Sequence, residues 1–206
     1  MFKMAWDNKA DKKTVEKTIA SLKANNINAF FVKNSSEAKK KVLELLPKKA
    51  EVMTMTSVTL EATGIAKEIN ESGDYNAIRD KLYSMDRKTQ GKRMQEIGAT
   101  PDWVIGSVHA VTEDGRLLIA SASGSQLPAY AYGSLNVIWV IGIQKIVKNL
   151  DEAFKRIYEH SLPLESERAR KAYGVPGSAV NKMLILNKEM QQGRINVIFV
   201  DEVLGF

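Results

Sequence analysis

Two hydroxyl-rich loops are the parts of this sequence that could bind an anion. The first, TMTSVT at residues 54–59, follows the apolar run EVMT and precedes an amphipathic segment. The hydroxyls of Thr56, Ser57 and Thr59, with the N–H groups of a helix start, could hold a phosphate or a carboxylate. The alternative is that Thr56 or Ser57 only caps that helix, since the loop lacks the glycines of a P-loop. Both interpretations stay open at this point.

The second loop is ASASGSQLPAYAYG, residues 120–133, directly behind the apolar run LLIA. Gly124 stands between Ser123 and Ser125, and a positive φ there would point successive N–H groups into one concavity. A plain polar turn is the alternative. The loop has no Gly-x-Ser-x-Gly elbow, so a serine hydrolase is disfavoured and binding is the better hypothesis for these serines.

Three further side chains are candidates for the same site. Lys145 follows the strand-like run NVIWVIGIQ and Lys182 opens a later one, so either ammonium could balance the charge of a bound anion. A solvated lysine at a strand end is an equally good interpretation of Lys145. His109 alternates with apolar neighbours, which favours a structural histidine over a catalytic one.

Hydrophobic periodicity predicts the elements that must position these residues. Helices are predicted over 11–26, 35 to about 47 with Ser35 and Ser36 as its cap, 58–69, 74–97, 150–158 and 164–173; strands over 27–32, 51–54, 103–105, 136–141, 182–186 and 195–200; and a hairpin over 106–121. This alternation indicates an α/β fold with a mostly parallel sheet and helices on both faces. In such sheets ligands bind beyond the carboxyl ends of the strands, where both loops are expected.

Composition indicates one soluble domain and excludes several kinds of site. The 206 residues are 44% hydrophobic and 26% charged, and we expect a single domain over 1–206, with residues 1–10 as a lead that could be mobile. We expect a cytoplasmic protein, since the sequence shows neither a secretory leader nor a membrane span. With no cysteine and two histidines, we expect no metal and no intrinsic cofactor, so any iron–sulfur centre would belong to a partner.

The net charge of +6 arises at one end of the chain. Residues 1–50 carry 12 Lys and Arg against 5 Asp and Glu, whereas the remainder carries 18 against 19. The main cluster, Lys39-Lys40-Lys41 with Lys48 and Lys49, is not interleaved with aromatic side chains. A solvated helix face is therefore favoured over a nucleic-acid surface, and we expect neither a nucleic-acid nor a membrane partner.

Three stretches carry a resemblance to a known family. They are GSVHAVTEDGRLLIASASGSQLPAYAYG, VIWVIGIQKIVKNLDEAFKRI and LPLESERARKAYGVPGSAVNKMLILNKE. Together they resemble the LUD-domain family of lactate-utilisation proteins over about residues 12–206, most specifically over 106–190. The resemblance implies an α/β domain of the type shared by ribose-5-phosphate isomerase, glucosamine-6-phosphate deaminase and CoA transferases. It also implies association with iron–sulfur partner subunits in the oxidation of lactate.

One departure from the family bears on function. Many members carry Glu-Thr-Gly-Thr where this chain has Ala122-Ser123-Gly124-Ser125, so the hydroxyls match but the carboxylate does not. Because related CoA transferases use a glutamate nucleophile, the change favours binding of a small anionic metabolite in lactate or related organic-acid utilisation. The alternatives are a free-standing enzyme acting on a phosphosugar or an acyl-CoA, and a protein-interaction module built on the basic N-terminal surface. A homo-oligomer stays open.

Overall fold

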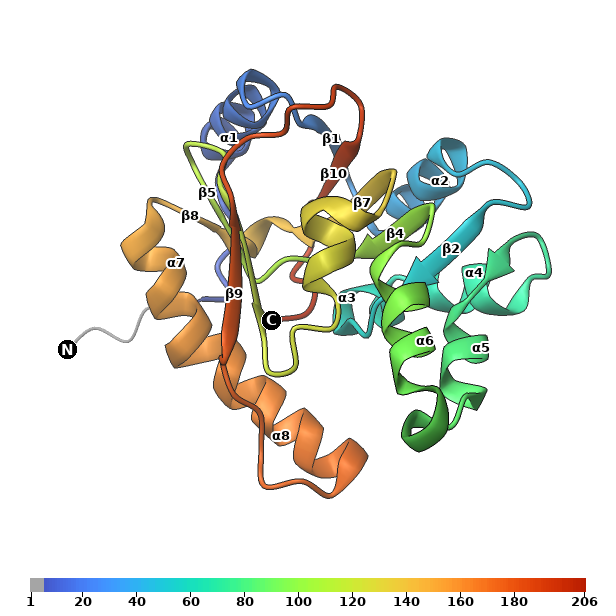
Figure 1. Cartoon of the computed structure of the whole chain (residues 1–206). Coiled ribbons are helices and arrows are strands. Elements are labelled where there is room, and N and C mark those ends of the chain that lie inside the picture. The colour runs from blue at the N-terminus through green and yellow to red at the C-terminus, as the bar shows by residue number, and fades with distance from the viewer. Residues whose placement is uncertain (1–5) are drawn as a thin grey trace.

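A six-stranded, all-parallel sheet forms the centre of the molecule (Figure 1). The computed structural model describes residues 6–206, so the first half of the predicted N-terminal lead lies outside the described residues. The strand order is β1 (Asn28–Val32), β10 (Ile195–Val200), β7 (Asn136–Gly142), β4 (Trp103–Gly106), β2 (Glu51–Thr54), β3 (Asn76–Ala77). The central strands β7 and β10 are apolar almost throughout because both of their faces are covered.

Helices cover both faces of this sheet, as predicted. One face packs against α2 (Ser35–Leu45), α3 (Val58–Ala62) and α4 (Ile65–Glu71), around a core that includes Val42, Leu60 and Ile69. The other face packs against α1 (Lys12–Ala24) through Val15 and Leu22, and against a second sheet. Near the edge strand β3 lie α5 (Arg79–Ser84) and α6 (Arg87–Ala99). The predicted α/β class with a mostly parallel sheet is confirmed.

The second sheet adds a layer that the sequence analysis did not anticipate. Its order is β8 (Ile146–Val147), β5 (Ala110–Thr112), β6 (Leu117–Ser121), β9 (Lys182–Leu186). The predicted hairpin is present as the antiparallel pair β5–β6, and β9 then pairs antiparallel with β6. One face of this sheet meets the main sheet, and the other packs against α7 (Leu150–Arg156) through Leu118, Val147 and Ala153.

Three predicted helical regions have different boundaries in the structure. The segment predicted as one helix over 74–97 is divided into the short strand β3 and the helices α5 and α6. The segment predicted as one helix over 58–69 is broken into α3 and α4 at Gly64, whose φ of 67° is left-handed. Conversely, the segments predicted as two helices join into one rod: α7, a π-helical turn Ile157–Ser161, and α8 (Leu162–Tyr173). A π turn inserts an extra residue into a helix without ending it, which periodicity alone does not reveal.

The capping residue of α2 also differs from the prediction. Asn34, rather than Ser35 or Ser36, occupies the N-cap, and its side-chain oxygen accepts a hydrogen bond from the Glu37 N–H at 2.9 Å. Asparagine is at least as good a cap as serine, and with Asn34 as the cap the helix begins at Ser35, one residue earlier than a serine cap at position 35 would give. Over residues 6–206, the structure contains no helix with the length and apolar character needed to cross a membrane.

Candidate functional site

A cavity of about 380 Å³ lies where the loops after β2 and β6 meet. It is lined by most of the residues singled out from the sequence: Thr56, Ser57, Thr59, His109, Ser123, Ser125 and Lys145. The two loops come from different sheets, since β2 belongs to the main sheet and β6 to the second one. Gly124, although part of the second loop, does not line the cavity, and neither does Lys182, which contacts this loop at Ser123.

Lys145 is the most unusual residue of the cavity. Strand β7 ends at Gly142, and the following 3-10 turn Ile143–Lys145 directs the side chain inward, where it is only 2% exposed. Its Nζ donates to Thr59 Oγ1 at 3.3 Å, Ser107 Oγ at 3.2 Å and the Val108 carbonyl at 3.2 Å. Within residues 6–206 no carboxylate forms an ion pair with it. Burial, and then the charge of Arg156, lower the pKa of Lys145 well below its usual value.

A second buried cation, Arg156, lies behind the cavity wall. Its side chain is fully buried, and Nη1 donates to the His109 carbonyl at 2.6 Å and to Ser161 Oγ at 3.1 Å. Nε and Nη2 have no hydrogen-bond partner in the described part of the chain. Burial lowers the pKa of Arg156 to about 10, an effect that the charge of the exposed Asp7 opposes only in part.

Sequence reasoning missed Arg156, although its position carried a signal. The arginine falls in the apolar register of its helix, three residues after the buried Ala153 and next to the buried Ile157. The π turn then places Ser161, five residues further on, within reach of the guanidinium. A charged side chain on the buried face of an amphipathic helix is rare without a paired acid, and that pattern indicates function.

His109 is held in one tautomer between these cations. Its Nδ1 accepts a hydrogen bond from the Ala120 N–H at 3.1 Å, which places the imidazole proton on Nε2. Burial lowers the pKa of His109 to about 3, with smaller effects from Lys145 and Arg156. The residue lies just before β5 rather than within it, and it is neutral at physiological pH. It both ties β5 to β6 and lines the cavity.

In the first loop, all three candidate hydroxyls have hydrogen-bond partners within the protein. Ser57 is the N-cap of α3, accepting from the Leu60 N–H at 3.4 Å, and α3 is only five residues long. Thr56 Oγ1 accepts from Arg79 Nη2 at 3.0 Å, while Arg79 Nη1 donates to the Thr54 carbonyl at 2.7 Å. Thr59 is buried beside Lys145 and donates to the Leu204 carbonyl at 3.1 Å. The capping interpretation of Ser57 therefore accounts for its backbone contact.

The second loop is a tight turn whose hydroxyls bond largely to one another. Ser121 Oγ accepts from the Gly124 N–H at 2.8 Å, and Ser123 Oγ donates to Ser125 Oγ at 3.1 Å. Gly124 has the expected positive φ, 84°, and a Cβ there would lie 2.6 Å from Cδ of Lys182. Lys182 itself donates to the Ser123 carbonyl at 2.7 Å. These contacts show how the loop is held in shape.

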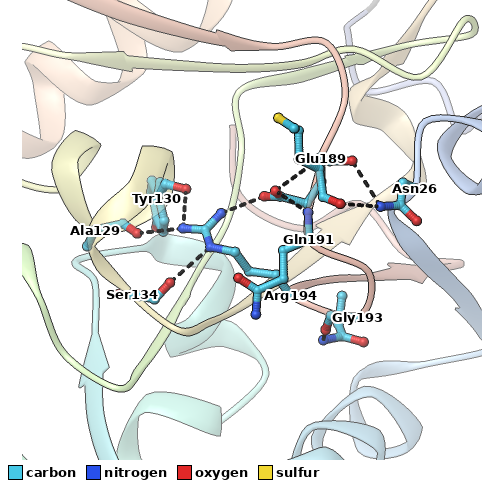
Figure 2. A network of polar contacts seen from close by, with 10 residues as sticks. Asn26, Ala129, Tyr130, Ser134, Glu189, Gln191, Gly193 and Arg194 are labelled. Carbon is cyan, nitrogen blue, oxygen red and sulfur yellow. Dashed lines mark hydrogen bonds and ion pairs between the residues drawn. The ribbon is translucent and has the colours of Figure 1, made fainter.

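Arg194 anchors the segment that follows this loop (Figure 2). The chain forms a π-helical turn, Ala129–Gly133, whose Tyr130 lines the cavity and packs edge-on against Trp139 at 5.2 Å. Arg194 donates to the carbonyls of Ser134 at 2.9 Å, Ala129 at 3.2 Å and Tyr130 at 3.0 Å, and it pairs with Glu189 at 2.8 Å. This cluster therefore fixes the wall that carries Tyr130.

Two arginine–tyrosine pairs line the outer part of the cavity. Arg79 lies over the Tyr83 ring on α5, with 5.0 Å from the guanidinium carbon to the ring centre. Arg168 lies over Tyr173 at 5.4 Å on α8 and is held by Glu165 through two hydrogen bonds of 2.7 Å. Helices α5 and α8 lie on opposite sides of the molecule's lower part in Figure 1. The cavity thus has a deep cationic end and an aromatic mouth.

Comparisons with known proteins agree with this fold. A DUF162 family protein from Deinococcus radiodurans superposes with a TM-score of 0.56 at 12% identity, over 91% of this chain and 96% of that one. The eIF2B beta structure from Chaetomium thermophilum gives a TM-score of 0.31 at 15% identity, over 66% of this chain and 43% of that one, too weak to carry an argument. A search of the curated proteins gives no match. The LUD domain model matches residues 15–200, nearly the whole chain, and the chain therefore belongs to the LUD-domain family.

Proposed function

We propose that this LUD-domain protein binds a small organic anion, in lactate or related organic-acid utilisation, in the cavity between the 54–59 and 121–126 loops. Lys145 and Arg156 are the residues that attract the anion, and Thr59, Ser107 and His109 surround the position of its charged group. Ser123 and Ser125 supply neutral hydrogen-bonding groups on the opposite wall.

The observation that carries this proposal is the lack of acidic partners for two buried cations. Removing a charge from water costs several kcal/mol unless an opposite charge or strong hydrogen bonds compensate for it. Lys145 has only neutral oxygen acceptors, and Arg156 leaves two nitrogens without any partner among residues 6–206. An anionic ligand would supply the missing charge, so these side chains favour anions over neutral or cationic ligands.

A thermal-shift experiment tests the proposal directly. Pyruvate, lactate, inorganic phosphate and ribose 5-phosphate are added separately to the purified chain, at pH 7 and low salt. A ligand at about 100 times its dissociation constant should contribute about 2.7 kcal/mol, or about 5 to 10 °C for a domain of this size. Lys145→Met should abolish the shift.

Lys182→Met provides the matched control for that experiment. It also removes one lysine near the second loop, but Lys182 does not line the cavity, so most of the shift should remain. Absence of a shift with every anion, or an equal shift in Lys145→Met and the unchanged chain, would contradict anion binding at this site.

A second candidate function is catalysis on a phosphosugar or an acyl thioester. The observation that favours it is the position of Lys145 in the cavity, within 3.3 Å of the Thr59 and Ser107 hydroxyls, together with its lowered pKa, because a buried lysine that loses its proton more readily than usual can exchange one with a bound substrate. Turnover of ribose 5-phosphate or acetyl-CoA that disappears in Lys145→Met and follows the ionisation of one basic group would support it. A panel of both substrate classes without turnover would exclude it.

Cooperation with iron–sulfur subunits and use of the basic N-terminal surface are separate parts of the proposal. Lys39 pairs with Glu68 at 2.6 Å and Lys41 with Glu44 at 2.6 Å, so two lysines of the cluster have acidic neighbours. These pairs favour a solvated helix face over a docking surface. Co-purification of an iron–sulfur protein with the tagged chain would support the subunit role, and its absence from cells using lactate would contradict it.

A further inference from the structure

The cavity is larger than the smallest organic acids require. At about 380 Å³ it falls within the 300–1,000 Å³ range of pockets that enclose drug-sized ligands, whereas lactate and pyruvate each have only six non-hydrogen atoms. An anion of that size bound at Lys145 would leave the outer part of the cavity to solvent. The residues that line this outer part therefore indicate which chemical group the ligand has besides its anionic group.

Tyr83 and Tyr173 are large aromatic side chains on this outer part, and both are exposed, by 65% and 60%. They come from α5 and α8, separated by about ninety residues of sequence, and each lies against a guanidinium. The arginines have other partners that fix them, namely the Thr54 carbonyl for Arg79 and Glu165 for Arg168. Each ring is therefore supported from its own helix while it remains accessible from the cavity.

Tyr83 is also connected to the loop that borders the cationic end. Its hydroxyl lies 3.5 Å from Thr56 Oγ1, and Thr56 accepts from the same Arg79 that supports the ring. A ligand bound at Lys145 and extending outward would pass this ring. Planar groups stack on tyrosine faces and on guanidinium planes, and such stacking does not depend on a particular hydrogen-bond pattern.

We infer that the ligand has two parts: an anionic group at Lys145, in front of the buried Arg156, and a planar ring held at the mouth by Tyr83 and Tyr173. This inference rests on the proposed anion-binding function and specifies its ligand as a ring-bearing anion. Phosphate and carboxylate are both compatible with the cationic end, and the experiment distinguishes them.

Two matched pairs of probes, measured by isothermal titration calorimetry, test the inference. Ribose 5-phosphate and AMP differ by the adenine ring, and pyruvate and phenylpyruvate differ by the phenyl ring. In at least one pair the ring-bearing member should bind about tenfold more tightly. The pair that binds identifies the anionic group as phosphate or carboxylate.

Substitutions then test which side chains give the ring-bearing probe its higher affinity. Tyr83→Ala and Tyr173→Ala should each reduce the advantage of the ring-bearing probe severalfold, where the advantage is the ratio of its affinity to that of the ring-free probe in the same variant. Tyr132→Ala is the control, because Tyr132 is 91% exposed and does not line the cavity. Both cavity tyrosines are exposed, so the variants should fold, which their melting temperatures will verify.

The outcomes separate this inference from the function on which it rests. If the ring-bearing probes bind no more tightly than the ring-free ones, the two-part ligand is wrong but the anion site is not contradicted. The same holds if the ring-bearing probe keeps its higher affinity in both tyrosine variants. No binding of any probe to the unchanged chain overturns both. Two results together support the anion site and the two-part ligand: loss of all binding in Lys145→Met, and a higher affinity for the ring-bearing probe that disappears when the tyrosines are substituted.

Discussion

Two buried cationic clusters in this domain differ in how their charges are compensated. Arg194 donates hydrogen bonds to three carbonyls and pairs with Glu189, and Asn26 in turn donates to the Glu189 carbonyl at 3.0 Å (Figure 2). Lys145 and Arg156 contact only neutral acceptors, and part of the Arg156 guanidinium has no partner among residues 6–206. The first cluster is complete by itself, whereas no carboxylate of residues 6–206 forms an ion pair with the second.

This difference separates a structural role from a binding role. A buried arginine whose donors are matched by carbonyls and a carboxylate stabilises the segments that it connects, here the π-helical turn and the segment before β10. Buried cations without a contacting acid cost stability, and their position in and directly behind the wall of a cavity favours a functional explanation. We therefore expect substitutions in the two clusters to differ in their effect on stability.

The largest effect is expected from Arg194→Met. The substitution removes every hydrogen bond of the guanidinium and leaves Glu189, whose side chain is 13% exposed, without its partner. We expect the free energy of unfolding to fall by about 3–5 kcal/mol. Urea unfolding followed by circular dichroism measures this change. A loss below about 1 kcal/mol would show that Arg194 is not the structural anchor described above.

The cationic cluster should make stability depend on pH through His109. The pKa of His109 is lowered from 6.5 to about 3, so the unfolded chain binds a proton before the folded one as the pH falls. Stability should therefore be lost from about pH 6.5 downward, by about 2 kcal/mol at pH 5.

His109→Gln is the comparison for that measurement, since its side-chain oxygen can accept from the Ala120 N–H but does not titrate. Urea unfolding at pH 7 and pH 5 should show a steeper loss for the unchanged chain than for the variant. Equal losses in both proteins would contradict the buried, neutral histidine.

A smaller effect is expected at the glycine of the second loop. Gly124→Ala imposes a side chain at a φ of 84° and brings its Cβ within 2.6 Å of Lys182 Cδ, so we expect a loss of about 1–2 kcal/mol. Gly193→Ala is a matched control, because Gly193 has a φ of 83° but no atom close to the added Cβ. Thermal unfolding should rank Gly124→Ala as the less stable of the two; the opposite order would contradict the close contact.

Much of the fold could be predicted because its elements obey simple periodicities. The apolar spacing in Val15, Ile19 and Leu22 gave α1, and the runs at 136–141 and 195–200 gave the central strands. The second sheet was not recognised, although its hairpin was, because the pairing of β9 with β6 joins segments about sixty residues apart. Long-range pairing of this kind leaves no local pattern in a sequence.

The location of the candidate site could be predicted from the sequence, but the hydrogen-bond partners and burial of its residues could not. Ligand binding beyond the carboxyl ends of strands led to both loops, and they do border one cavity. The serines were identified as candidates by residue type, yet the hydroxyls of Ser121 and Ser123 form hydrogen bonds within the turn itself. Arg156 was missed although it falls in the apolar register of its helix, and the contact of its guanidinium with Ser161 depends on a π turn that periodicity does not reveal.

The most direct test of the account is the ligand-free stability of Lys145→Met. Methionine keeps a long apolar side chain at this position but removes the buried ammonium and the cost of its desolvation. We expect the free energy of unfolding at pH 7 to stay within about 1 kcal/mol of the unchanged chain or to rise. A loss of about 3–5 kcal/mol, comparable to that expected for Arg194→Met, would contradict it, because Lys145 would then be a structural cation like Arg194.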